Sequence, residues 1–143
     1  NAFSDLVNLE KLNLGNNFLQ IDKNSQMFSS LNPNLINLIL NDNLFEQLEP
    51  YNFKSVLFEI NLSKNRLKKI KINMNKLERL FVNFNYLTSI DDLTFQNMNN
   101  LKRLSISNNR IEAISLKAFE KMINLNYFSL SSNSLKTLSS KQF

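Results

Sequence analysis

The sequence predicts an α/β fold in the form of a repeat solenoid. Three observations lead to this prediction: an eleven-residue pattern recurs six times, an asparagine holds a fixed place in each copy, and apolar residues recur between the copies. Such a chain is expected to wind into a horseshoe arc, with a parallel β-sheet on the concave face and short irregular or 3-10 return legs on the convex face. No run of about 18 apolar residues breaks the pattern, so no membrane span is expected.

The strand of each repeat comes from the pattern LxxLxLxxNxL, with Ile, Val or Phe allowed at the Leu positions. Its Leu-x-Leu step has a period of two, so two side chains point inward and their neighbours point outward. One such strand cannot bury its apolar side alone, and we expect successive strands to stack in parallel about 4.8 Å apart. The six copies are LEKLNLGNNFL (9–19), LINLILNDNLF (35–45), LFEINLSKNRL (57–67), LERLFVNFNYL (77–87), LKRLSISNNRI (101–111) and LNYFSLSSNSL (125–135).

The asparagine of each copy lies where the chain turns off the strand. Its amide can both donate to and accept from backbone groups that the turn leaves unpaired. Stacked copies would then form an asparagine ladder, which has a structural role and is not a ligand site. The ladder residues are Asn17, Asn43, Asn65, Asn85, Asn109 and Asn133.

A second apolar column is expected on the return side, where aromatic residues fill the convex half of the core. The combined pattern FxxLxxLxxLxLxxNxLxxL, about 24 residues long, resembles the leucine-rich repeat family across essentially the whole chain. It is most similar to the subtype of animal extracellular proteins, which includes Toll-like receptor ectodomains, insect immune repeat proteins and adhesion or guidance receptors. The column consists of Phe3, Phe53, Phe95, Phe119 and Phe143, with Phe28 shifted in the second turn.

The two ends of the sequence have the same phase in the repeat, because NAF at 1–3 and KQF at 141–143 both align with KAF at 117–119. Extracellular members of the family normally close both ends with cysteine-rich caps. We therefore expect residues 1–143 to be a single array of about six repeats, an uncapped piece of a longer solenoid.

The early repeats are irregular. Successive copies begin 26, 22 and 20 residues apart and then settle at 24, and the segment KKIKINMNK leads into Leu77 without a convex phenylalanine. Because a shortened return leg makes a thinner turn, we expect the solenoid to change curvature between residues 50 and 80. Such irregularity often marks a binding region, although insertions and deletions also drift freely on loops, and both interpretations stay open.

The composition argues against an enzyme. The chain has no His and no Cys, which excludes a Cys/His metal site, a disulfide framework and a His or Cys nucleophile or base. It also lacks a glycine-rich phosphate loop. The one adjacent acidic pair, Asp91–Asp92, falls on a turn where an Asp is expected to cap the backbone. We expect no catalytic residue and no cofactor.

Apolar residues occupy outward positions of the predicted sheet in three consecutive copies, the second to the fourth. Phe81 and Phe84 stand out, because Leu and Val take all the inward positions of their copy. An exposed apolar cluster rimmed by charge is typical of a protein-binding site. Surface drift, mutual coverage and a homodimer contact remain alternatives. The predicted partner-binding residues are Ile36, Ile39, Phe58, Arg79, Phe81, Phe84 and Arg103.

Asn61 is the acceptor of the only N-x-[ST] sequon in the chain, and it falls in the middle of this cluster. A glycan on Asn61 would occupy the centre of the concave site and would move partner binding to a flank. Asn61 is therefore both a candidate glycosylation site and a test of the concave-face hypothesis.

A basic stretch, RLKKIKINMNKLER at 66–79, carries six Lys or Arg against one Glu. Its alternation places Ile70 and Ile72 inward and Lys69 and Lys71 outward. An anionic glycan or an acidic lipid could bind there, and a simple solvated face is the alternative. Because no aromatic residues interleave with the cations, nucleic acid is not an expected partner.

The resemblance implies a non-enzymatic recognition module of a receptor or of a secreted immune or adhesion protein. We expect it to be extracellular or at the cell surface, and to bind a protein partner, or form a homo- or heterodimer, through the concave face. Any membrane attachment would come from flanking segments outside this sequence. A self-assembling structural scaffold and a cytosolic adaptor array remain alternatives.

Overall fold

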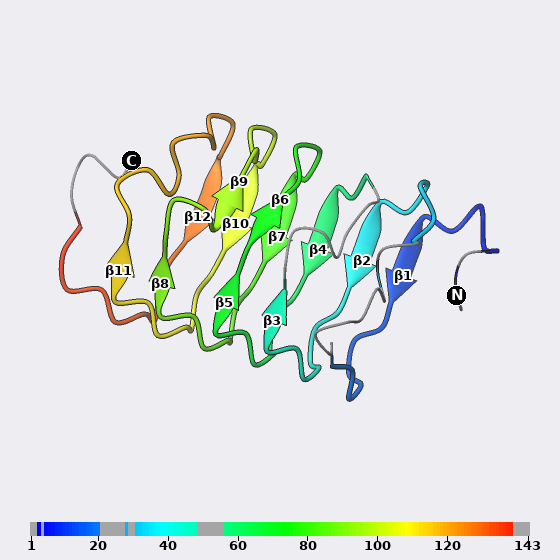
Figure 1. Cartoon of the computed structure of the whole chain (residues 1–143), viewed down its shortest axis with the longest axis horizontal. Coiled ribbons are helices and arrows are strands. Elements are labelled where there is room, and N and C mark those ends of the chain that lie inside the picture. The colour runs from blue at the N-terminus through cyan, green and yellow to red at the C-terminus, as the bar shows by residue number, and fades with distance from the viewer. Residues whose placement is uncertain (1–2, 4, 21–27, 29–30, 49–55, 139–143) are drawn as a thin grey trace.

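The large sheet is the frame of the molecule. The computed structural model describes residues 3, 5–20, 28, 31–48 and 56–138 (Figure 1). Six three-residue strands form one sheet in which each strand pairs in parallel with the strand of the next turn, so the chain winds as a solenoid. The strands are β1 (Lys11–Asn13), β2 (Asn37–Ile39), β4 (Glu59–Asn61), β7 (Arg79–Phe81), β10 (Arg103–Ser105) and β12 (Tyr127–Ser129).

Six shorter strands of two residues each lie on the return legs, again in parallel pairs. Figure 1 shows β3, β5, β8 and β11 in a second row along one side of the large sheet. The pairs are β3 (Gln47–Leu48) with β5 (Lys69–Ile70), β8 (Ser89–Ile90) with β11 (Ala113–Ile114), and β6 (Ile72–Asn73) with β9 (Phe95–Gln96).

The predicted α/β class needs a correction, because the described residues contain no helix, α or 3-10, and all their regular elements are strands. The described return legs are too short for a helix. After the asparagine turn, such a leg forms a two-residue side strand and then only single turns. Over residues 115–122, for example, the N–H groups of Ala118, Glu120 and Met122 each donate to the carbonyl three residues earlier, and no longer helix develops. Within the described part of the chain, no helix has the length and apolar character needed to cross a membrane.

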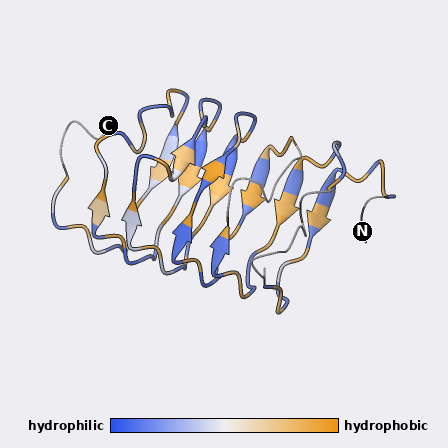
Figure 2. Ribbon diagram, in the orientation of Figure 1, coloured by the Kyte–Doolittle hydropathy of each residue, from blue (hydrophilic) through white to orange (hydrophobic). Residues whose placement is uncertain are grey.

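The core is a continuous apolar column, as the period-two pattern predicts. The central residue of each strand is in register with its neighbours, so that Ile60 pairs with Leu80 and Leu80 pairs with Leu104, and all three are fully buried. Figure 2 shows hydrophobic and hydrophilic residues side by side within the strands of the large sheet. This alternation puts one face of the sheet into the core and leaves the other outside.

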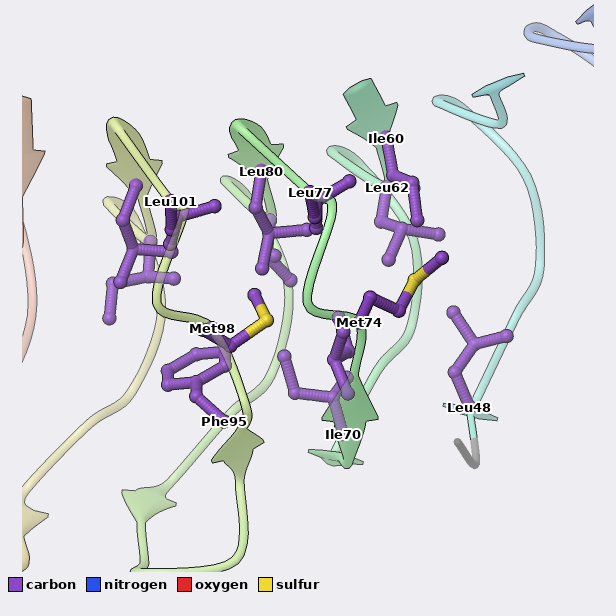
Figure 3. Packing of buried hydrophobic residues seen from close by; sticks show 14 of the residues in the cluster. Leu48, Ile60, Leu62, Ile70, Met74, Leu77, Leu80, Phe95, Met98 and Leu101 are labelled. Atoms are coloured by element: carbon purple, nitrogen blue, oxygen red, sulfur yellow. The ribbon is translucent and has the colours of Figure 1, made fainter. Parts of the chain in front are cut away.

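Aromatic and methionine side chains fill the half of the core that faces the return legs. Phe28, Phe95 and Phe119 are buried, Phe3 packs against the cluster, and the rings of Phe95 and Phe119 stack at 6.3 Å between centroids. Figure 3 shows how side chains from the return legs close the interior opposite the strand leucines. The predicted column is confirmed at these positions, whereas Phe53 and Phe143 lie outside the described residues.

The shortest repeat fills its convex side without phenylalanine. Ile70, Ile72 and Met74 are buried there, and Lys69 and Lys71 are exposed, which confirms the predicted alternation. The predicted change of curvature between residues 50 and 80 involves residues 49–55, which lie outside the described residues, and it stays a prediction.

The asparagine side chains join each turn to the one before it. The Asn85 Nδ2 donates to the carbonyls of Val82 (3.2 Å) and Asn83 (3.2 Å) in its own turn and to Leu62 (3.0 Å) in the preceding turn. The Asn85 Oδ1 accepts the N–H of Leu67 at 3.0 Å. Asn43, Asn65, Asn109 and Asn133 make the same set of bonds, and Asn17 donates only within its own turn.

Candidate protein-binding surface

The outward face of β2, β4 and β7 carries the apolar side chains that the sequence singles out. The register aligns Ile39 with Asn61 and Asn61 with Phe81, so these three side chains form one row across neighbouring strands. All three are partly buried. Ile36 and Phe58 lie just before β2 and β4, and the Phe58 N–H donates to the Ile36 carbonyl at 2.8 Å.

The structure divides the predicted cluster into two parts. Ile36 and Phe58 line a depression of about 380 Å³ at the edge where the strands begin, together with Val56, which the repeat pattern does not mark as an outward position. Phe84 follows β7 at the opposite edge. The two positions are six residues apart in the repeat, because Glu78 corresponds to Phe58 and precedes Phe84 by six residues. Ile39, Asn61 and Phe81 lie between the two parts.

Phe84 combines exposure with an unfavourable backbone conformation. It has a φ of 56° and is 53% exposed. The equivalent residue of every other copy is also left-handed, with φ between 54° and 56°. Asn and Asp adopt this conformation most easily among residues that carry a side chain, and a bulky aromatic residue adopts it rarely. The corresponding residues are Asn16, Asp42, Lys64, Asn108 and Ser132.

A row of charged and aromatic side chains runs beside the apolar residues. Arg79 forms an ion pair with Glu59 at 3.1 Å, and the register places Arg103 between Arg79 and Tyr127. The Arg103 guanidinium carbon lies 4.8 Å from the centroid of the Tyr127 ring. Tyr127 is absent from the predicted site, although its place in the same outward column was readable from the repeat. Arg and Tyr are the residue types in which binding hot spots are enriched.

Asn61 is partly buried at the centre of this face, and its Oδ1 accepts the N–H of Ser63 at 3.0 Å. Asn61 lies between Ile39 and Phe81 in the row that these three residues form across the strands. A glycan on Asn61 would cover the centre of the surface, as the sequence predicts. Whether Asn61 is modified stays a prediction.

The outward face of β10 and β12 is built from mutually bonded serines. The Ser105 Oγ donates to the Asn83 Oδ1 at 2.7 Å, and the Ser107 Oγ lies 2.6 Å from that of Ser129 and 2.9 Å from that of Ser131. Ser105 and Ser107 are buried. Because these hydroxyl groups have partners within the chain, this part of the face needs no ligand to satisfy them.

Acidic side chains on the turns have structural partners. The Asp91 Oδ1 accepts the N–H of Leu93 at 2.9 Å and the hydroxyl of Thr94 at 2.8 Å, so Asp91 caps its turn as predicted. Asp92 accepts a hydrogen bond from the Ser115 hydroxyl. Among the described residues, no group of three or more His, Cys, Asp or Glu side chains gathers in a way that could hold a metal ion.

The parallel sheet, the asparagine ladder and the variable outward face define a class of stacked-repeat proteins. The chain belongs to the leucine-rich repeat family: residues 1–81 match the family described as "BspA type Leucine rich repeat region (6 copies)" and residues 75–135 match "Leucine rich repeat". The predicted family is therefore confirmed. Repeat domains of this family are typically non-catalytic. No curated protein matches the chain in sequence.

Among solved structures, the chain is similar to the Toll ectodomain in the "Structure of the Toll - Spatzle complex, a molecular hub in Drosophila development and innate immunity". The two are 25% identical in sequence, with a TM-score of 0.65. The match covers 83% of this chain and 18% of the Toll chain, so this chain spans under a fifth of the length of that protein.

Proposed function

We propose that this array is a protein-recognition module, part of an extracellular receptor or of a secreted immune or adhesion protein, and that it binds a protein partner through its concave face. The fold is consistent with protein recognition, and the similar Toll protein is known from a complex with Spatzle. The observation that carries the proposal is Phe84, which is 53% exposed in a left-handed conformation. The left-handed turn recurs in every copy and belongs to the scaffold, whereas only this copy places an aromatic side chain there, and its exposed apolar area is what a partner could bury.

The proposed contact surface combines the two apolar parts with the charged row between them. Phe81 and Phe84 would supply one apolar anchor, and Ile36 and Phe58 would supply the other, in the depression of about 380 Å³. Arg79 and Arg103 would contact acidic or polar groups of the partner. Ile39 lies between the anchors and would contribute apolar area. Clustered aromatic and Arg anchors surrounded by polar groups are the usual source of binding energy in protein interfaces.

The proposal is tested by affinity isolation from the native extracellular fluid with the wild-type chain and the Phe84→Asn variant. We expect a defined partner protein that the wild type retains and that Phe84→Asn and Phe81→Ser both lose. The matched control is Phe18→Ser, because Phe18 is 86% exposed but follows a ladder asparagine and so lies off the concave face. Partner retention by Phe84→Asn, or equal loss in Phe18→Ser, would contradict the proposal.

Two further measurements separate this proposal from its alternatives. Sedimentation of the wild-type chain over a range of concentrations distinguishes a self-assembling scaffold, in which association rises with concentration and disappears in Phe84→Asn. Peptide mapping of Asn61 in the native protein tests the extracellular location. A glycan there would establish passage through the secretory pathway, and it would move the proposed contact from the centre of the face to its two edges.

A further inference from the structure

A second hollow lies off the concave face, on the flank that follows the ladder asparagines. It has a volume of about 520 Å³, within the usual range for small-ligand sites. Its walls come from three successive turns, which backbone hydrogen bonds hold side by side: the Tyr86 N–H donates to Leu67 and the Arg110 N–H donates to Leu87, both at 2.9 Å. The lining residues are Lys68, Lys69, Tyr86, Thr88 and Arg110.

An aromatic ring and a guanidinium group are held together in this hollow. The Arg110 guanidinium carbon lies 4.5 Å from the centroid of the Tyr86 ring, a cation–π contact that fixes both side chains, and Tyr86 remains 40% exposed. The basic stretch at 66–79 contains no aromatic residue, which is why the sequence alone shows only a charged face there. The ring comes from the next turn of the solenoid.

The hollow is strongly basic. Three of its five lining residues are cations. Glu112 lies in the turn beside Thr88, whose carbonyl accepts the Glu112 N–H at 3.0 Å, and Glu46 pairs with Lys68 at 3.3 Å. Both side chains of that pair are well exposed, so the attraction between them is weak and competes little with a bound anion. Thr88 adds a hydroxyl that can donate and accept. The residues together offer a flat apolar ring, a planar bidentate donor, two point charges and a neutral hydrogen-bonding group.

We infer that this hollow binds an acidic saccharide through its sulfate or carboxylate groups. Arg110 would hold the anionic group with two parallel hydrogen bonds, Lys68 and Lys69 would neutralise its neighbours, and the Tyr86 ring would lie against the sugar ring. Nucleic acid fits less well, because successive bases need a series of aromatic platforms, and among the described residues Tyr86 alone provides an aromatic ring in this hollow. The inference is independent of the proposed concave site.

The test is the affinity of the intact chain for a heparin hexasaccharide, measured by calorimetry at physiological salt. We expect Arg110→Gln and Lys69→Gln each to weaken binding about tenfold, because each removes a charge-assisted contact. Tyr86→Leu, which keeps an apolar side chain, should also weaken it. The matched control is Lys136→Gln: Lys136 is exposed and occupies the repeat position of Lys68 three turns further on, where it should change affinity less than about twofold.

The competitors separate the sources of the anionic group. A fully desulfated hexasaccharide retains its carboxylates, so its binding would assign recognition to carboxylate, and its failure to bind would assign recognition to sulfate. Equal displacement by single-stranded DNA or polyglutamate of the same charge would overturn the inference, as would unchanged affinity in both Arg110→Gln and Tyr86→Leu. Phe84→Asn should bind the hexasaccharide like the wild type. The saccharide inference and the proposed protein-binding surface can therefore be contradicted independently of each other.

Discussion

Two halves of the outward face of the large sheet contrast sharply. Over β2, β4 and β7 five outward side chains are apolar and at least partly exposed among polar and charged neighbours: Ile36, Ile39, Phe58, Phe81 and Phe84. Over β10 and β12 the outward side chains include a network of serines that bond to one another and to Asn83. Strand length, register and ladder bonds are the same in both halves.

The contrast shows that the repeat sets the scaffold and leaves the outward positions free. The serine hydroxyl groups over β10 and β12 bond within the chain, so they need no partner to satisfy them. The apolar half keeps hydrophobic area in contact with water and an unfavourable backbone conformation at Phe84. A partner that covers this area would offset the cost of exposing it to water. The irregular repeat spacing of 26, 22 and 20 residues falls in the same half, whereas the spacing of 24 residues falls in the other.

The largest expected effect tests whether the two halves share one core. Leu80→Ala in β7 and Leu104→Ala in β10 should each lower the free energy of unfolding by about 2–5 kcal/mol, because both side chains are fully buried and their removal leaves a cavity. Chemical denaturation measures this, with the exposed Leu116→Ala as control. If Leu80→Ala lowered the free energy of unfolding by less than about 1 kcal/mol while Leu104→Ala did not, the core under β7 would be loosely packed. The two halves would then not share one equally packed scaffold.

The next effect concerns the ladder that joins the turns. Asn85→Ala and Asn109→Ala should each cost about 1–3 kcal/mol, since each leaves buried backbone groups without partners. Asn17→Ala should cost less, because Asn17 is exposed and donates only within its own turn. Equal costs at all three positions would show that the bonds between turns add little, contrary to the account of the ladder.

A smaller effect is expected in the serine half. Ser107→Ala removes a buried hydroxyl with two hydroxyl partners and should lower the free energy of unfolding by about 1 kcal/mol. The exposed Ser134→Ala provides the control in thermal or chemical unfolding. No measurable loss at Ser107 would mean that the network is not part of the stability of the scaffold, and that half would then be as available for a partner as the apolar half.

Much of the scaffold is readable from the sequence because the repeat phase determines which face each residue occupies. This covers the buried Leu80 and Leu104, the inward Ile70 and the outward Lys69. The return legs were less predictable. The pattern fixes where apolar residues recur but not whether so short a leg forms a helical turn or a two-residue strand. The described return legs contain no helix, so the α/β assignment is not shown there.

The candidate sites could be predicted only in part. The repeat pattern tells which face of the solenoid a residue occupies, but it does not give the distance between two residues in space. Ile36 and Phe84 belong to one predicted cluster, yet they lie at opposite edges of the sheet. Tyr86 and Arg110 come from different repeats, so their contact at 4.5 Å appears only when the turns are stacked. The signal was present in the column that follows each ladder asparagine, which contains Arg66, Tyr86 and Arg110 in sequence order.

The most direct measurement is the free energy of unfolding of Phe84→Asn against the wild type. If Phe84 serves partner binding and not the fold, Phe84→Asn should change the free energy of unfolding by less than about 1 kcal/mol, because relief of the left-handed strain offsets the apolar contacts that the half-exposed ring still makes. Three of the other five copies carry Asn or Asp at this position, in Asn16, Asp42 and Asn108, and the remaining two carry Lys64 and Ser132. A loss of more than about 1 kcal/mol would show that Phe84 stabilises the fold itself, and the proposed role of this face would be contradicted.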